Sequence, residues 1–235
     1  MIDQLFNDLT LADYHGDLHR NIVSIRESQD LFDDLSPNPI AWKAAVDLEI
    51  SAKPHTYISQ QTIIDRPFEE ATYNEAIQYP FNHWSCSRYS DGSFGVWYGS
   101  DTLETSIYET VYHWHKRFLE DAGWQARSGI IGERKVYLVR CDAALLDFIP
   151  KLEAFPALSD ASSAYHFTHQ VGARISHDGH PGLVSRSARC EGDIYAIFNA
   201  KVLSNPRHIC YLSYHLREGG RITVERQPGE VLLTI

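Results

Sequence analysis

The sequence predicts an α+β protein with a mixed or antiparallel β core, flanking helices and a helical N-terminal segment. Three observations support this fold class. Helical patterns occupy the first part of the 235-residue chain, a helix follows a short aromatic strand in the middle, and strand-like segments succeed one another toward the C-terminus. Helices and strands do not alternate regularly, and neither GxGxxG nor GxxxxGK[ST] occurs. A Rossmann or P-loop array is therefore not expected.

Residues 1–65 are expected to form a helical N-terminal extension. The apolar residues before the helix-breaking sequence SPNP recur near helical spacing: Leu18, Ile22, Ile25 and Leu31. A helical pattern resumes after this break in PIAWKAAVDLEISA. No repeat or low-complexity linker interrupts the chain, so we expect this extension to pack on a core domain formed by residues 66–235.

A strand followed by a helix is predicted in the middle of the chain. The segment SFGVWYG is short, aromatic and bounded by Gly and Ser, which favours a strand. The next segment has a helix start signal, because Asp101 can cap the helix and Glu104 lies three residues later. The residues of this helix that recur at the spacing of one buried stripe are Leu103, Ile107, Thr110, Val111 and Trp114. Glu109 lies away from that stripe, as an ordinary surface glutamate would.

The later elements are predicted to be mostly strands. RKVYLVRCD has strand composition, and AYHFTHQVGARISHDGH is expected to be a helix that ends at Gly179. The strand-like segments that follow are PGLVSRSAR, DIYAIFNAKVL, ICYLSYHL, RITVERQ and EVLLTI. REGGR lies between the third and fourth of these and predicts a hairpin connection.

Composition and charge exclude several classes of protein. The formal net charge is -10, and no basic block is present, which argues against a general nucleic-acid binder. No run of 18 apolar residues occurs, and the N-terminus lacks the layout of a signal peptide, so a cytoplasmic protein without a membrane segment is expected. The histidine pairs HWH, HFTH and HDGH lack the remaining ligands and spacing of a known zinc site, so no metal is predicted.

Five polar and aromatic residues occur in an order and spacing that point to a known family. SRYSDGSFGVWYGSDTLETSIYET contains Arg88, Tyr98 and Glu109, and the later GLVSRSAR and GDIYAIFN contain Ser187 and Asn199. In these motifs, over about residues 66–220, the sequence resembles the RES-domain family, which is named after an Arg, a Glu and a Ser.

The sequence departs from the family pattern at two places. Many members carry another arginine ahead of the Arg-Phe or Arg-Tyr pair, where this chain has Asn82. Many also have Pro before the Ser, where this chain has Arg186. Arg66 is a candidate to supply the missing guanidinium from elsewhere.

The resemblance implies a fold similar to that of ADP-ribosyltransferases and an activity on NAD. Many members are toxins of bacterial toxin–antitoxin pairs that deplete NAD by phosphorolysis or hydrolysis of the nicotinamide–ribose bond. Their antitoxin is usually a small helix-turn-helix protein that covers the active site. The implied catalytic residues are Glu109, Arg88 and Ser187. The implied substrate-binding residues are Tyr98, Asn199 and Arg66. No cofactor beyond NAD as substrate is expected, with inorganic phosphate as co-substrate in the phosphorolytic case; the oligomeric state stays open.

These residue types suit that chemistry. Cleavage of an N-glycosidic bond builds positive charge on the ribose, which a carboxylate such as Glu109 can stabilise. The guanidinium of Arg88 can bind two oxygens of a diphosphate, and Tyr98 offers a flat face for nicotinamide or its ribose. Two alternatives stay open: a mono-ADP-ribosyltransferase that modifies a protein, and an inactive RES-like protein that only forms complexes. The second is favoured by the arginine lost at Asn82.

Overall fold

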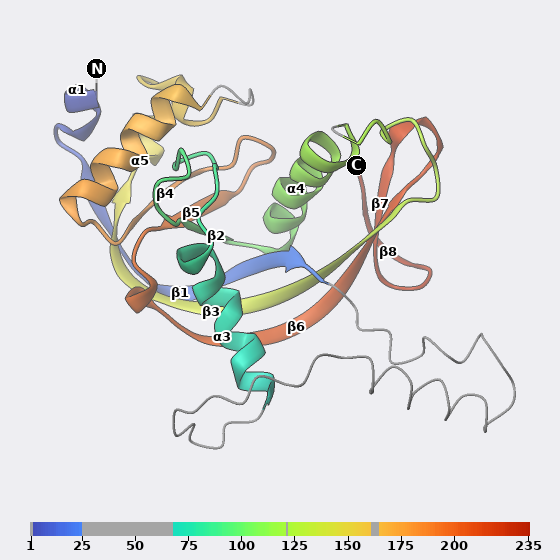
Figure 1. Ribbon diagram of the computed structural model, residues 1–235. Coiled ribbons are helices and arrows are strands. Elements are labelled where there is room, and N and C mark those ends of the chain that lie inside the picture. Colours follow the sequence, from blue (N-terminus) through green and yellow to red (C-terminus); the bar gives the residue numbers. More distant parts are fainter. Residues whose placement is uncertain (1, 25–67, 121, 161–164) are drawn as a thin grey trace, which may run out of the picture. The chain divides into compact units, whose positions relative to one another are not determined.

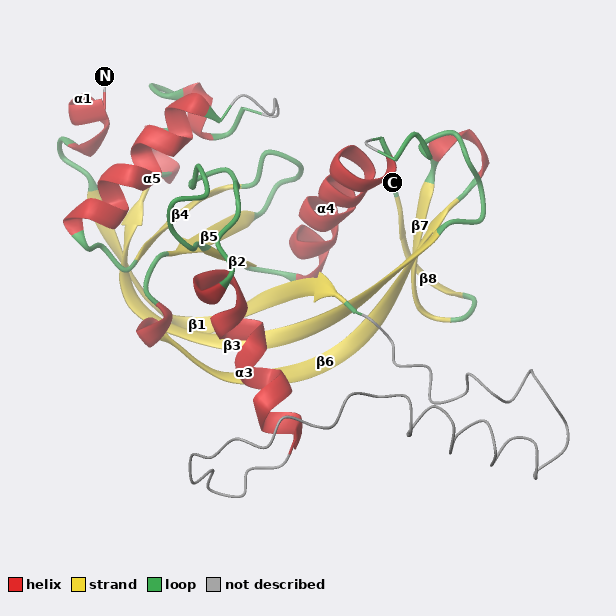
Figure 2. Cartoon of the chain, viewed as in Figure 1, coloured by secondary structure: helices red, strands yellow, loops and turns green. Residues whose placement is uncertain are grey.

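The structure is a computed structural model that describes residues 2–24, 68–120, 122–160 and 165–235 (Figures 1 and 2). These described residues belong to one compact unit. Its α-helices are α1 (Ile2–Phe6), α3 (Phe68–Asn82), α4 (Leu103–His113) and α5 (His166–Asp178). Its strands are β1 (Thr10–Val23), β2 (Trp97–Ser100), β3 (Ile131–Asp147), β4 (Gly182–Arg186), β5 (Asp193–Ile197), β6 (Leu203–Leu216), β7 (Ile222–Gln227) and β8 (Glu230–Thr234). A π-helical turn, η1 (Trp114–Leu119), continues α4, and short 3-10 turns are η2 (Ile149–Lys151), η3 (Pro156–Leu158), η4 (Ala200–Val202) and η5 (Glu218–Gly220).

The strands form one eight-stranded sheet in the order β1-β2-β5-β4-β3-β6-β7-β8. Because β1 also pairs with β3, the first five strands of this order close on themselves as a ring. Only the pairing of β3 with β4 is parallel among the described strands, and the others are antiparallel. The α+β prediction with a mixed, mainly antiparallel core is confirmed, while the likeness to ADP-ribosyltransferases stays a prediction.

The helical prediction for the N-terminal segment is wrong over Thr10–Val23, which form β1 and pair with β3 along their whole length. The reason lies in the spacing of the apolar residues. Leu18 and Ile22 are four positions apart, which puts them on one face of a helix but also on one face of a strand. Leu18 is fully buried in the ring. The predicted helix in PIAWKAAVDLEISA and the predicted boundary at residue 65 lie outside the described residues.

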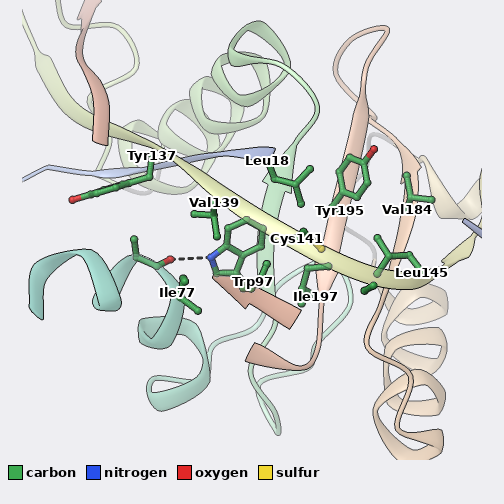
Figure 3. Close-up of a cluster of buried hydrophobic side chains, with 13 residues drawn as sticks. Leu18, Ile77, Trp97, Tyr137, Val139, Cys141, Leu145, Val184, Tyr195 and Ile197 are labelled. Atoms are coloured by element: carbon green, nitrogen blue, oxygen red, sulfur yellow. Dashed lines mark hydrogen bonds between the residues drawn. The ribbon is translucent and has the colours of Figure 1, made fainter. Parts of the chain in front are cut away.

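The interior of the ring holds the first hydrophobic core (Figure 3). Side chains from β1 to β5 converge there, and α3 closes the core with Ala76 and Ile77. The largest of these side chains is Trp97 of β2, which is fully buried and donates its indole N–H to the carbonyl oxygen of Ala76 at 2.8 Å. The predicted strand SFGVWYG is thus confirmed in its second half, where β2 contributes Trp97 to the core that α3 closes.

The predicted helix in the middle of the chain is confirmed as α4, but its cap is one residue later than expected. Thr102 is the N-cap, and its hydroxyl accepts the N–H of Thr105 at 3.1 Å. The carboxylate of Asp101 instead accepts the N–H groups of Thr102 at 2.7 Å and of Asp193 at 3.0 Å. Asp101 therefore joins the start of α4 to the start of β5 rather than capping the helix.

A second core lies between α4 and the β6–β7 part of the sheet. The predicted stripe is confirmed, because Ile107 and Val111 are almost completely buried and Leu103 and Trp114 pack beside them. β6 and β7 are joined through the REGGR segment, as predicted, and pair antiparallel.

The helix α5 packs over the third core and ends as predicted. Its C-cap is Gly179, whose φ of 74° is favourable for glycine. Gly172 in the middle of α5 has a packing role, since a Cβ there would lie 1.7 Å from the carbonyl oxygen of Tyr89. The absence of a side chain at Gly172 therefore lets α5 approach the loop that carries Arg88 and Tyr89.

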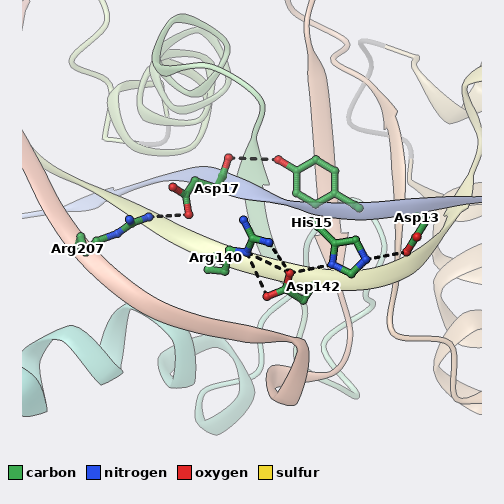
Figure 4. A network of polar contacts seen from close by, with 7 residues as sticks. Asp13, His15, Asp17, Arg140, Asp142 and Arg207 are labelled. Atoms are coloured by element: carbon green, nitrogen blue, oxygen red, sulfur yellow. Dashed lines mark hydrogen bonds and ion pairs between the residues drawn. The ribbon is translucent and has the colours of Figure 1, made fainter.

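The polar surface of β1, β3 and β6 carries a network of charged side chains (Figure 4). His15 lies between Asp142 and Asp13, with N–O distances of 2.9 and 3.0 Å. Arg140 contacts the same Asp142 at 2.8 Å, and an ion pair between Arg207 and Asp17 joins β6 to β1 at 2.5 Å.

No helix in the described part of the chain is long and apolar enough to span a membrane.

Candidate active site

Glu109 and Ser187, 78 residues apart, are hydrogen-bonded partners in the folded chain. The Ser187 hydroxyl donates to Oε1 of Glu109 at 2.5 Å and accepts the backbone N–H of Arg189 at 3.0 Å. The loop after β4 fixes Ser187 further, because its own N–H donates to the carbonyl of Gly192 at 2.8 Å. Within the described residues, Ser187 is the one hydrogen-bond partner of the Glu109 carboxylate, so Oε2 can accept a ligand hydroxyl.

The direction of Glu109 follows from the way α4 is anchored. Burial of the stripe around Ile107 turns Glu109 away from the second core. On the buried side of α4, the hydroxyl of Tyr214 in β6 lies 2.8 Å from the hydroxyl of Thr110. Asn21 of β1 donates to the same Tyr214 oxygen at 2.9 Å, and Arg134 of β3 donates to Asn21. Three strands thus hold the turn of α4 that carries Glu109.

Arg88 lies in the loop before β2 and is 9% exposed. Its Nη1 donates to the carbonyl oxygens of Leu158 at 3.4 Å and Asp160 at 3.0 Å, and its guanidinium lies 5.1 Å from the ring centroid of Tyr165. These are its only hydrogen bonds to described residues. A guanidinium has five N–H donors, so three of those on Arg88 make no hydrogen bond to a described residue.

Tyr98 holds the Arg88 loop rather than presenting a free hydroxyl. Its oxygen accepts the N–H of Tyr89 at 3.0 Å and lies 2.9 Å from the hydroxyl of Ser87. Burial raises the pKa of Tyr98 well above its usual value, so the hydroxyl stays protonated. The same residue is tied to β1, because Arg20 donates to its carbonyl oxygen at 2.8 Å.

The buried hydroxyl of Tyr89 is subject to the charges of both Arg88 and Glu109. Burial raises the pKa of the Tyr89 hydroxyl to about 12, while the charge of Arg88 lowers this pKa and that of Glu109 raises it. Both charges therefore act on a single buried hydroxyl. The structure joins Glu109 of α4 to Ser187 at the end of β4 by a hydrogen bond, and a single site that also includes Arg88 stays a prediction.

One of the predicted substrate-binding residues, Asn199, is not brought to this region. Asn199 follows β5 at the end opposite to Ser187, because Arg186 pairs with Asp193 and Gly182 with Ile197. The Asn199 side chain is exposed and caps the 3-10 turn η4 by accepting the N–H of Lys201 at 3.0 Å. Arg66 lies outside the described residues. Asn82, at the position of the missing family arginine, is exposed at the end of α3.

The structure adds residues that the sequence prediction did not single out. Cys190 lies beside Ser187 and Thr105, and burial raises its thiol pKa. Arg189 stacks on Tyr112 of α4, with its Cζ 3.2 Å from the ring centroid. The sequence signal that could have identified Arg189 and Cys190 is their position two and three residues after Ser187. No group of three or more His, Cys, Asp or Glu among the described residues could hold a metal ion.

The comparison with family models agrees with the motifs. The family model of the RES domain matches residues 63–217, which is more than half of the chain. The chain belongs to the RES-domain family. Among solved structures, the crystal structure of the M. tuberculosis MbcT-MbcA toxin–antitoxin complex contains a chain that matches with a TM-score of 0.48 and 9% identity over 90% of each chain. No curated protein matches the sequence.

Proposed function

We propose that this protein cleaves the nicotinamide–ribose bond of NAD and acts as the toxin of a toxin–antitoxin pair. The observation that supports this most is the Glu109 carboxylate, which is held by Ser187 through one oxygen and keeps the other available. Membership of the RES-domain family supports the choice of NAD as substrate.

The reaction needs few protein groups. Departure of nicotinamide leaves positive charge on the ribose, and Glu109 stabilises that charge while Oε2 accepts a ribose hydroxyl. Nicotinamide leaves as a neutral amine-like group, so no strong general acid is needed. Arg88 offers N–H donors to the diphosphate, and a charge-assisted contact of this kind suits a guanidinium. An oxygen of water or of inorganic phosphate then bonds to the ribose carbon that nicotinamide has left, and an attacking water loses a proton.

The direct test measures NAD loss by the purified protein with and without inorganic phosphate. Wild type should consume NAD, and Glu109→Gln should abolish the loss because it removes the charge with almost no change of shape. Glu104→Gln is the matched control, since Glu104 is an exposed glutamate in the first turn of the same helix. Equal activity of Glu109→Gln and wild type would show that the carboxylate charge is not used.

The products distinguish the reaction classes. ADP-ribose identifies hydrolysis, and its phosphorylated form, with phosphate as co-substrate, identifies phosphorolysis. NAD labelled in its ADP-ribose part would leave label on a protein if the chain were a mono-ADP-ribosyltransferase. Recovery of all label in small molecules is the expected result.

The toxin role is tested in cells. Expression of the wild-type chain in a bacterium should lower cellular NAD and arrest growth, whereas expression of Glu109→Gln should do neither. A small helix-turn-helix protein encoded beside this chain is the proposed antitoxin, and its co-expression should restore growth. Growth arrest by both variants at unchanged NAD would contradict the proposal.

A further inference from the structure

Arg189 lies beside the Glu109–Ser187 pair and is held there in two ways. Its backbone N–H donates to the Ser187 hydroxyl, which in turn donates to Glu109. Its guanidinium stacks on the ring of Tyr112, with Cζ 3.2 Å from the ring centroid. The backbone hydrogen bond fixes the position of the Arg189 main chain, and the stacking on Tyr112 fixes the position of its guanidinium group.

The helix α4 brings that charge close to the carboxylate. Tyr112 is three residues after Glu109 in α4, so the two side chains project from the same face on adjacent turns. Three residues advance a helix by about 4.5 Å. The guanidinium over Tyr112 is therefore about one turn from the carboxylate, on the helix face that Ser187 approaches.

A substrate bound through Glu109 would place a phosphate group near this position. If the carboxylate holds a hydroxyl of the nicotinamide ribose, the phosphate on the 5′ oxygen is only a few bonds away. A diphosphate carries about two negative charges, and an anion taken out of water without cations costs several kcal/mol. Arg88 supplies one guanidinium, and Asn82 cannot supply another.

We infer that Arg189 is the second cation of the site and binds the phosphate next to the nicotinamide ribose. Arg189 thus takes the role for which the sequence suggested Arg66. The inference rests on the proposed function for the identity of the substrate. It assigns to Arg189 a phosphate ester or diphosphate ligand. The stacked guanidinium presents its donors in one plane, which suits a phosphate better than the mobile ammonium of a lysine.

The test compares substrates that differ in their phosphates. Arg189→Gln should raise KM roughly ten- to hundredfold for NAD and nicotinamide mononucleotide, the range of one charge-assisted contact. Cleavage of nicotinamide riboside, which has no phosphate, should not change. Arg189→Lys should lie between, because it keeps the charge and loses the planar fork. Arg186→Gln is the control, since Arg186 lies three residues earlier and pairs with Asp193 at the surface.

The outcomes separate the two sources of phosphate. A defect confined to phosphate-bearing substrates assigns Arg189 to the substrate. A loss of dependence on inorganic phosphate with every substrate, riboside included, assigns it to a phosphate co-substrate. Equal loss with all substrates and no change in phosphate dependence, or no loss at all, would overturn the inference.

A binding measurement keeps the inference independent of catalysis. Calorimetry with inorganic diphosphate should show binding to wild type and to Arg186→Gln, and roughly ten- to hundredfold weaker binding to Arg189→Gln. If wild type binds diphosphate in this way but does not cleave NAD, the proposed reaction fails and the anion site stands. If wild type does not bind diphosphate, or the Arg189→Gln variant binds it equally well, the inference fails whatever the activity. Thermal unfolding of each variant without ligand checks that the fold is kept.

Discussion

The Glu109–Ser187 pair shows how one residue can be positioned without losing its charge. An ion pair would offset the carboxylate charge that the proposed reaction needs, whereas a neutral hydroxyl orients one oxygen and leaves the charge in place. Ser187 is fixed for this purpose by Gly192 and by the N–H of Arg189. Ser187 is thus a positioning residue in the proposed site.

Loss of this hydroxyl should reduce kcat more than it raises KM. A hydrogen bond to a charged group contributes about 1.5–3 kcal/mol, so Ser187→Ala should lower kcat for NAD roughly ten- to hundredfold. Ser185→Ala is the matched control, because Ser185 is fully buried in β4, two residues before Ser187, and among the described residues only Ser187 is hydrogen-bonded to Glu109. Steady-state kinetics give kcat and KM for NAD of both variants. Equal losses of kcat in Ser187→Ala and Ser185→Ala would assign Ser187 a purely structural role.

His15 offers a residue-scale test of the charged surface network. Its contacts with Asp142 and then Asp13 raise the pKa of the imidazole above its usual value. Because the folded pKa is raised, the stabilisation from the protonated ring is complete below the unfolded pKa of about 6.5. It is lost as pH rises through the folded pKa.

The relative effects of Asp142 and Asp13 on the His15 pKa can be measured by an NMR titration of the His15 ring. Asp142→Asn should lower the titration midpoint more than Asp13→Asn, because the hydrogen bond that the protonated His15 ring donates to Asp142 is the largest cause of the raised pKa. A midpoint that does not move in either variant would mean that the network does not persist in solution.

At the scale of elements, the helix α4 depends on a buried polar cluster that joins it to three strands. Asn21, Arg134 and Tyr214 are each less than 10% exposed, and burial lowers the pKa of Arg134. Buried polar groups of this kind are costly unless every member has a partner. The hydroxyl of Tyr214 is the shared partner of Asn21 and Thr110, so it connects β1 and β6 to α4.

Tyr214→Phe removes that shared partner and should lower the free energy of unfolding by about 1–3 kcal/mol, the cost of leaving buried donors unpaired. It should also reduce kcat for NAD, since Thr110 is next to Glu109. Tyr211→Phe is the control on the same strand, because Tyr211 is 39% exposed. Urea denaturation measures the difference, and equal stability of the two variants would show that the cluster does not anchor α4.

At the scale of the whole molecule, local patterns identified elements, but they did not identify how the elements meet. The stripe containing Ile107 and the αL residue Gly179 are local signals, and both predicted their helices correctly. β1 was missed because residues four positions apart satisfy both a helical and a strand period, and only its pairing with β3 decides between them. Glu109, Arg88 and Ser187 were predicted to belong to one site, but the motifs did not indicate that Ser187 donates a hydrogen bond to Glu109 across the contact between α4 and the loop after β4. The stacking of Arg189 on Tyr112 also arises only from tertiary contact.

The ring of five strands makes the N-terminal strand part of the core rather than a removable extension. Leu18 and Leu11 lie on the same strand, but Leu18 is fully buried in the ring while Leu11 is 59% exposed. Leu18→Ala should therefore lower the free energy of unfolding by about 2–5 kcal/mol, from lost burial and the cavity left behind. Leu11→Ala removes the same atoms from a solvent-facing position, and its effect should stay within about 0.5 kcal/mol. Denaturant unfolding monitored by tryptophan fluorescence would report on this region, because Trp97 packs in the same core as Leu18. Similar unfolding midpoints for the two variants would mean that β1 does not close the ring in solution, whereas a large loss confined to Leu18→Ala would show that the first strand completes the core around Trp97.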